Sequence, residues 1–124
     1  MQTTKLRQKI MINNFEKNIS GEVTVIQTNK RLDANVSDIY KQRIKNLIDQ
    51  GKINIVLDMS KTEFMDSCGL ACIVSRIAKI RSLNGDLRLS AVGAQVNKVL
   101  EITNLDKILS CYDNNEDAIN SFKL

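Results

Sequence analysis

The apolar run at residues 53–58 most constrains the fold, because it is short, rich in β-branched residues and flanked by two helical patterns. Such a run is typical of a strand that is buried on both faces of a sheet. Gly51 just before it provides a stop for the first helical pattern. A buried strand between two helices predicts an α/β domain whose strands pair in parallel through crossover helices. The apolar residues of the first helical pattern are Tyr40, Ile44, Leu47 and Ile48.

Periodicity along the rest of the chain predicts a complete α/β domain. Strands are expected at residues 10–16, 22–28, 53–58, 87–91 and 108–112. Helices are expected from residue 35 or 37 to 50 and at residues 67–83, 94–103 and 116–122. The first two strands flank a turn at Ser20-Gly21, which makes the sheet mixed. We therefore expect a loosely ordered arm at residues 1–9 and one domain at residues 10–124, in which about four helices pack on a mixed, mostly parallel sheet of four to five strands.

Composition excludes several classes of protein. The chain has 124 residues, of which 43% are hydrophobic and 26% charged, as in a single soluble globular domain. The polar, basic N-terminus lacks the apolar segment of a signal peptide, and no run is long enough to span a bilayer. We therefore expect a cytoplasmic protein that does not bind membranes. The net charge of +4 comes from cations spread along the chain, so direct nucleic-acid binding is a weak option.

A polar motif, Asp66-Ser67-Cys68-Gly69-Leu70, follows the apolar strand and opens the second helix. It places the Ser67 hydroxyl at or near a helix N-terminus, where free backbone N–H groups and the helix dipole favour a negative group. A phosphate on Ser67 would lie in a site that tolerates its charge, which favours a covalent switch over a catalyst. Asp66 is interpreted either as the N-cap of the helix or as a group that orients the hydroxyl.

These residues resemble the STAS domain family, and specifically the bacterial anti-sigma factor antagonists. The resemblance covers roughly residues 10–122 and is strongest over residues 53–109. The motif Asp66-Ser67-x-Gly69-Leu70 is similar to the family's phosphorylation site. Residues 99–105, which read VLEITNL, are similar to the family's "VLELTGL" helix end. Two such motifs in the right order and spacing make a strong signal.

The chain departs from the family pattern at two positions that usually hold Gly. Leu32-Asp33 resembles the end of a "G-x-L-D" segment that lies near the phosphoacceptor and the kinase-binding face in the family, but Lys30 stands where Gly is usual. We expect Lys at this position to change the backbone shape of the loop and the choice of partner. Asn104 replaces the Gly of the "TGL" element, which is a mild change because Asn tolerates the left-handed conformation.

The resemblance implies that Ser67 is a phosphoacceptor in a partner-switching regulator of transcription. A serine kinase that is also an anti-sigma factor would phosphorylate Ser67, and a PP2C-type phosphatase would reverse the reaction. The unphosphorylated form would bind the kinase and release the sigma factor, and phosphorylation would block this binding. Because the kinase would supply ATP, the metal and the catalytic groups, we expect no catalytic residue, metal or cofactor in this chain. Residues that would support the phosphosite or bind the partner are Asp33, Asp66, Cys68, Gly69 and Leu70.

Two other functions are weighed against this one. A STAS domain that does not switch would instead scaffold a transporter or a lipid-trafficking complex, although such a role needs no hydroxyl at Ser67. A serine hydrolase is disfavoured because the chain has no His, and Ser67 has no evident general base. We therefore expect that the protein is not an enzyme.

Two further groups of side chains have a functional and a structural interpretation. Cys68 and Cys72 are spaced i, i+4 as two metal ligands can be, but only Cys111 and carboxylates could complete a zinc site, so packed, reduced thiols are expected. A set of basic residues in the second helix either meets an acidic partner surface or forms a solvated helix face. This basic set is Arg76, Lys79 and Arg81.

Overall fold

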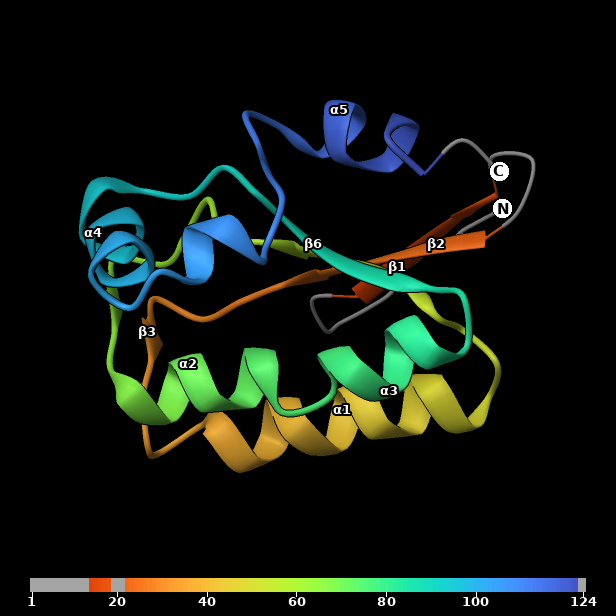
Figure 1. Ribbon diagram of the computed structural model, residues 1–124, viewed down its shortest axis with the longest axis horizontal. Helices are drawn as coiled ribbons and strands as arrows, with labels where there is room; N and C mark the ends of the chain where they lie inside the picture. Colours follow the sequence, from red (N-terminus) through yellow and green to blue (C-terminus); the bar gives the residue numbers. More distant parts are fainter. Residues whose placement is uncertain (1–13, 19–21, 123–124) are drawn as a thin grey trace.

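The computed structural model describes residues 14–18 and 22–122, and its centre is a five-stranded sheet in the order β1-β2-β4-β6-β7 (Figure 1). β1 and β2 pair antiparallel, and the other neighbours in this sheet pair in parallel. The predicted mixed, mostly parallel sheet is therefore confirmed. The predicted arm at residues 1–9, the start of the first strand and the turn at Ser20-Gly21 lie outside the described residues. The strands of this sheet are β1 (Asn14–Asn18), β2 (Glu22–Gln27), β4 (Asn54–Asp58), β6 (Asp86–Ser90) and β7 (Cys111–Tyr112).

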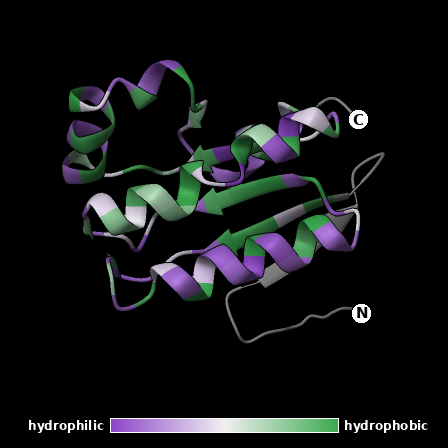
Figure 2. Cartoon of the chain, turned by 60° about the horizontal axis from the view of Figure 1, so that its bottom comes forward, coloured by the Kyte–Doolittle hydropathy of each residue, from purple (hydrophilic) through white to green (hydrophobic). Residues whose placement is uncertain are grey.

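Helices cover both faces of the sheet. α1, α2 and α3 lie on one face, and α5 lies on the other (Figure 1). Figure 2 shows apolar strands enclosed between helices that carry hydrophilic residues. Within the described part of the chain, no helix is both long and apolar enough to cross a membrane. The helices are α1 (Ser37–Asp49), α2 (Ser67–Val74), α3 (Ile77–Ser82), α4 (Ala94–Ile102) and α5 (Asn115–Asn120), with a 3₁₀ turn, η1 (Leu105–Lys107), after α4.

β4 is buried on both faces, as its apolar composition predicts. Ile55 and Leu57 belong to the larger hydrophobic core, which lies between the sheet and helices α1 to α4. Val56 points to the other face and packs in a smaller core with residues of β2 and α5. Alternating side chains of one strand therefore enter two cores, because successive residues of a strand point to opposite faces.

The four apolar residues of the first helical pattern are all buried in α1, and Gly51 follows this helix with a φ of +79°. A left-handed backbone at this position favours Gly and ends the helix. Asn104 follows α4 and also has a left-handed backbone conformation, with a φ of +61°. The expectation that Asn serves there in place of Gly is therefore confirmed.

The helix predicted over residues 67–83 is two helices, α2 and α3. Arg76 interrupts it with φ −113° and ψ 0°, and a new helical hydrogen bond starts when the N–H of Ile80 donates to the Arg76 carbonyl at 2.9 Å. Neither Pro nor Gly lies at the break. The apolar period continues across the break, since Ile73 and Ile77 are both buried, so periodicity alone predicts one helix.

Two strands were not predicted from the sequence, because each has only two residues. β3 (Arg31–Leu32) and β5 (Phe64–Met65) pair in parallel as a separate small sheet. The strand predicted at residues 108–112 is shorter than expected. It comprises β7 alone, because the chain first forms the 3₁₀ turn η1.

Candidate functional site

The small β3–β5 sheet brings two predicted site residues to neighbouring strand ends. Leu32 pairs with Met65, and an aspartate follows each of them, Asp33 after β3 and Asp66 after β5. The N–H of Asp66 donates to the carbonyl of Leu32 at 3.4 Å, which keeps the two chain segments together. The sequence motifs around Asp33 and Asp66 are more than thirty residues apart, but their backbones are adjacent in the fold.

Asp66 is the N-cap of α2, which confirms one of its two interpretations. Its Oδ1 accepts hydrogen bonds from the N–H groups of Cys68 at 2.9 Å and Gly69 at 3.0 Å. These donors would otherwise have no partner in the helix. The prediction that free N–H groups would receive a phosphate here is therefore wrong for these two donors. A phosphate on the next residue would lie beside the carboxylate that already occupies them.

Ser67 is the first residue of α2, and its side chain is exposed. No described residue forms a hydrogen bond with its hydroxyl. Asp66 caps the helix in its place, so the hydroxyl is not needed for local structure. The hydroxyl at the start of α2 is therefore open to a visiting enzyme.

Gly69 and Leu70 fix the start of α2 against the rest of the fold. A Cβ on Gly69 would lie 1.9 Å from the carbonyl oxygen of Leu32, so the helix approaches β3 too closely for any side chain. Leu70 is buried in the larger core. Cys68 is exposed beside Ser67, so the expectation of a packed thiol is wrong for this residue, and only its backbone N–H has a role in the cap. The motif thus combines two residues that hold the helix with two that face solvent.

Asp33 shapes the loop between β3 and α1. Its Oδ1 accepts a hydrogen bond from the N–H of Asn35 at 3.0 Å, and its Oδ2 pairs with Nε of Arg31 at 3.3 Å. The Asp33 carbonyl accepts hydrogen bonds from the N–H groups of Val36 and Ser37 at the start of α1. Arg31 also stacks over the ring of Phe64, 4.3 Å from its centroid. The stacking of Arg31 on Phe64 joins β3 to β5, and the other contacts order the loop that leads to α1.

The cysteines are not arranged as a metal site. Cys72 is buried, and its Sγ donates to the carbonyl of Gly69 at 2.9 Å. Burial raises the pKa of the Cys72 thiol to about 12, although the positive charge of Lys41 lowers it and the charge of Asp66 raises it further. The thiol is therefore protonated at neutral pH. Among the described residues, no three His, Cys, Asp or Glu side chains lie close enough together to hold a metal ion.

Sequence reasoning missed Gln95, which holds β5 from the side of α4. Its Oε1 accepts the N–H of Met65 at 3.0 Å, and its Nε2 donates to the Met65 carbonyl at 3.3 Å. The Gln95 side chain therefore forms hydrogen bonds with the backbone of β5, directly before Asp66. A polar residue in the first turn of a helix is common, so the sequence carries no signal for this role.

A cleft of about 770 Å³ lies at the carboxyl ends of β2 and β4, next to Asp33. Its walls are the loops at residues 27–36 and 60–63. Lys30 lies in this wall with a negative φ, and its carbonyl accepts the N–H of Glu63 at 2.8 Å. The backbone at Lys30 does not require Gly, so this departure from the family pattern causes no strain in the loop.

Comparisons with known proteins agree with this arrangement. The family model of the STAS domain matches residues 14–118. The TM1081 homolog of Thermotoga neapolitana is 30% identical over 106 residues, which cover 85% of this chain and 94% of that protein. The anti-sigma F factor antagonist of Paenibacillus polymyxa is 28% identical over 103 residues, which cover 82% of this chain and 88% of that protein.

The unphosphorylated form of the anti-sigma factor antagonist SpoIIAA has the same fold, with a TM-score of 0.68 at 21% identity over 89% of this chain and 97% of that chain. SpoIIAA of Bacillus has also been solved in a phosphorylated form, with a TM-score of 0.67 at 22% identity over 87% and 97% of the two chains.

Proposed function

The chain belongs to the STAS domain family, among the anti-sigma factor antagonists, and we propose that it works by partner switching. In its unphosphorylated form it binds a cognate anti-sigma factor that is also a serine kinase, and this binding releases the sigma factor. Phosphorylation of Ser67 by that kinase ends the binding, and a PP2C-type phosphatase restores it. The two solved forms of SpoIIAA support a covalent switch in this fold.

The observation that carries the proposal is the exposed, unpaired hydroxyl of Ser67 at the start of a capped helix. A kinase must bring the γ-phosphate of ATP in line with the attacking oxygen, which requires an accessible hydroxyl in a defined position. Asp66 supplies the cap and Gly69 fixes the distance to β3, so the position of Ser67 is defined by its neighbours. Its own side chain stays available for reaction.

The charge at this site explains why phosphorylation would end binding. A phosphoserine carries about −1.5 to −2 charges at neutral pH. It would stand next to the Asp66 carboxylate, whose partners are already the N–H groups of Cys68 and Gly69. In a docked complex both negative groups would have to be desolvated together. An unpaired buried charge costs several kcal/mol, and about 1.4 kcal/mol changes an affinity tenfold. Release therefore needs little change in the conformation of the domain.

The test is phosphorylation in vitro with the candidate kinase and ATP, followed by mapping of the modified residue. Ser67→Ala should abolish labelling and keep the affinity for the kinase, because the hydroxyl makes no contact that the fold needs. Ser67→Asp should weaken binding, because it places a permanent charge at the docking surface. Ser75→Ala is the matched control, since Ser75 is also exposed and ends the same helix. Labelling of Ser67→Ala at the wild-type level would show that Ser67 is not the phosphoacceptor.

A further inference from the structure

Positively charged side chains differ in whether they have a carboxylate partner. Arg81 and Arg88 both pair with Asp86, and Lys45 pairs with Asp49. Arg31 and Lys30 also have acidic partners, in the loops around the cleft. Several other cations have no carboxylate partner among the described residues. Lys61, Lys98 and Lys107 lie outside α1, α2 and α3, whereas three lie in the helix layer that these helices form. These three, which we call the basic face, are Lys41, Arg76 and Lys79.

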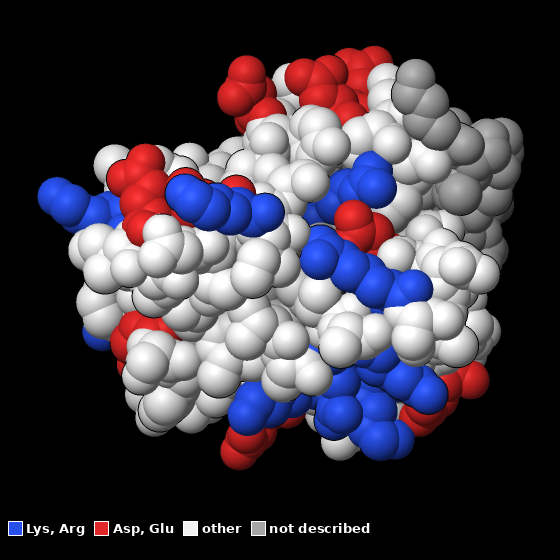
Figure 3. Space-filling view, in the orientation of Figure 1, with Lys and Arg blue, Asp and Glu red and all other residues white. Residues whose placement is uncertain are grey.

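The helix layer has few acidic residues to balance this charge. No Asp or Glu occurs in the sequence between Asp66 and Asp86, which covers all of α2 and α3. α1 has acids only near its two ends, Asp38 and Asp49, and the second is paired with Lys45. Figure 3 shows Lys and Arg gathered along the lower edge of the molecule, over α1 and α3. This part of the surface therefore has an excess of positive charge.

The three side chains come from adjacent helices. α1 lies beside α2, and the positive charge of Lys41 reaches the Cys72 thiol of α2. Arg76 lies at the break between α2 and α3, and its Nε is buried without a hydrogen-bond partner in the described part of the chain. Lys79 is exposed in α3. Arg76 is partly exposed and has no carboxylate partner among the described residues, so its charge can attract an acidic surface from outside.

The surface near α4 and η1 serves as a contrast within the same molecule. Lys98 and Lys107 are exposed there, but Glu101 and Asp106 accompany them in equal number. Charges of both signs are the usual state of a solvated surface. The scarcity of acids in the helix layer, and their absence from α2 and α3, is therefore a property of that layer and not of the chain as a whole.

The basic face lies within reach of a partner that docks at Ser67. Arg76 lies nine positions after Ser67, which corresponds to about 14 Å along a helix at 1.5 Å per residue. A typical interface buries about 800 Å² on each partner, so a round one is roughly 30 Å across. A kinase centred near Ser67 would therefore cover part of the basic face.

We propose that the basic face, Lys41, Arg76 and Lys79, binds an acidic surface of the serine kinase that docks at Ser67. This inference rests on the proposed function, and it adds that the kinase surface facing these cations is acidic. Opposite charges across an interface speed association and orient the two proteins. The same acidic surface would repel the charge that phosphorylation adds to Ser67. One arrangement of charges thus attracts the kinase before the transfer and favours its release afterwards.

The experiment measures how fast the full chain and its variants associate with the kinase in the presence of ADP. The kinase is the one that the labelling assay identifies. For Lys41→Glu/Lys79→Glu we expect association about tenfold slower than wild type at about 50 mM NaCl, and a weaker dependence of the rate on salt. The control Lys98→Glu/Lys107→Glu makes the same change in net charge outside the basic face. It should associate within about twofold of the wild-type rate. Thermal unfolding checks that each variant is folded, and Lys41→Gln/Lys79→Gln gives a smaller effect of the same sign if the charge reversal unfolds the protein.

Several results would overturn the inference without affecting the proposed function. Lys41→Glu/Lys79→Glu could associate as fast as wild type while Ser67→Asp still binds weakly, in which case the kinase does not use these cations. An equal slowing of the control variant would show a general charge effect. Binding of the wild-type protein to phosphatidylglycerol vesicles that is lost in Lys41→Glu/Lys79→Glu, with kinase association unchanged, would assign the basic face to a membrane.

Discussion

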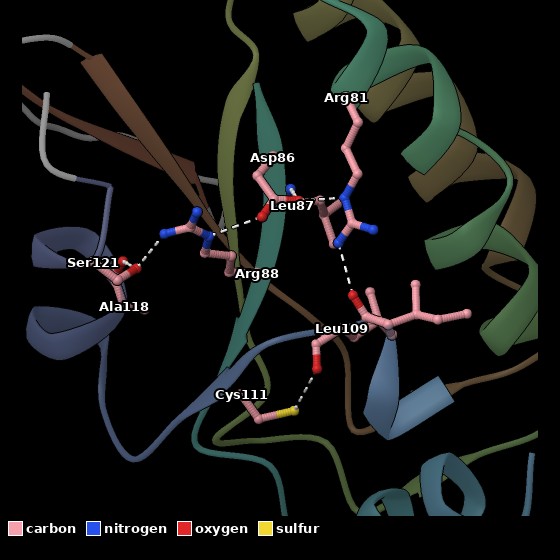
Figure 4. Close-up of polar contacts among 9 residues, drawn as sticks. Arg81, Asp86, Leu87, Arg88, Leu109, Cys111, Ala118 and Ser121 are labelled. Carbon is pink, nitrogen blue, oxygen red and sulfur yellow. Dashed lines mark hydrogen bonds and ion pairs between the residues drawn. The ribbon is translucent and has the colours of Figure 1, made fainter. Parts of the chain in front are cut away.

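The start of α2 and the amino end of β6 each contain an aspartate that accepts several hydrogen bonds, but the two sites use them differently. Asp66 binds only backbone N–H groups of its own helix, and the hydroxyl next to it stays exposed. Asp86 binds the side chains of Arg81 at 2.9 Å and Arg88 at 3.0 Å, and also the N–H of Leu87 (Figure 4). One aspartate organises a single helix turn, and the other joins separate elements.

The Asp86 site extends through its two arginines to the rest of the fold. Arg81 donates to the carbonyl of Ile108 at 2.7 Å, and Arg88 donates to Oγ of Ser121 at 2.7 Å (Figure 4). The network therefore links α3, β6, the turn after η1 and the end of α5. Its charged groups are bound to one another, and all three side chains are partly exposed. We therefore assign stability to the Asp86 network and phosphorylation to the start of α2, and substitutions of Asp86 and of Ser67 should have separable effects.

The largest effect is expected from Gly69→Ala, at the α2 site. The added Cβ would lie 1.9 Å from the Leu32 carbonyl oxygen, so helix and strand must separate. We expect a loss of about 3 kcal/mol in the free energy of unfolding, measured by chemical denaturation. Gly93→Ala is the control, because a Cβ there meets only the carbonyl oxygen of Thr62, at 3.8 Å. If Gly69→Ala is as stable as Gly93→Ala, the close approach of α2 to β3 is not required.

The second effect is expected from Asp86→Asn, at the other site. Burial raises the pKa of the Asp86 carboxyl, but the hydrogen bonds from Arg81 and Arg88 outweigh burial, so this pKa lies below its usual value. Loss of the charge should cost about 2 kcal/mol at neutral pH, measured by chemical denaturation. Kinase binding should be unchanged. Glu63→Gln is the control, because Glu63 and Lys30 form an ion pair whose side chains are 71% and 73% exposed. Solvent screens such a pair, so its loss should change stability little.

The pH dependence of the Asp86→Asn effect follows from the direction of this pKa shift. A carboxyl whose pKa is lowered by folding stabilises the protein fully above the pKa of an unfolded aspartate, about 3.9. The contribution is lost as the pH falls towards the folded-state pKa. The stability difference between wild type and Asp86→Asn should therefore shrink below about pH 4. A difference that stays constant down to acid pH would show that the charge of Asp86 is not the source of the effect.

The smallest effect is expected from Asp66→Ala, which removes the cap of α2. A lost N-cap costs about 1 kcal/mol, measured by thermal or chemical unfolding. Asp66→Asn keeps an acceptor oxygen and should retain most of this stability. If Asp66 is only a cap, then Asp66→Asn is phosphorylated at the wild-type rate. A strong loss of Ser67 labelling in a stable Asp66→Asn variant would instead show that the carboxylate orients the hydroxyl.

The parts of the fold that were predicted correctly are those with a long local pattern. α1 has four buried apolar residues at helical spacing, and β4 contains three consecutive buried apolar residues, so each local pattern predicts its element. Asn104 and Gly51 end helices through a backbone preference that each residue carries itself. β3 and β5 were missed because two residues contain no period, and the break at Arg76 was missed because the apolar stripe continues through it.

The candidate site was predicted only in part for a similar reason. The motif around Ser67 indicated a hydroxyl at a helix start, and its exposure agrees with this. The cap by Asp66 takes the N–H groups that were expected to hold a phosphate, and this competition between neighbouring groups depends on side-chain geometry. Gln95 could not be found, since its partner is the backbone of Met65, thirty residues earlier in the chain.

The amino-acid order by itself determined the class of fold, the position of the helix that begins at Ser67 and the lack of acidic residues from 67 to 85. These are local properties, because periodicity, capping preference and charge belong to the chain wherever it folds. Only the tertiary structure decided that Asp33 lies next to Asp66, that Gly69 has no room for a side chain and that α1, with Lys41, packs beside α2. Such placements depend on which distant segments pack together, and packing is set by the whole core.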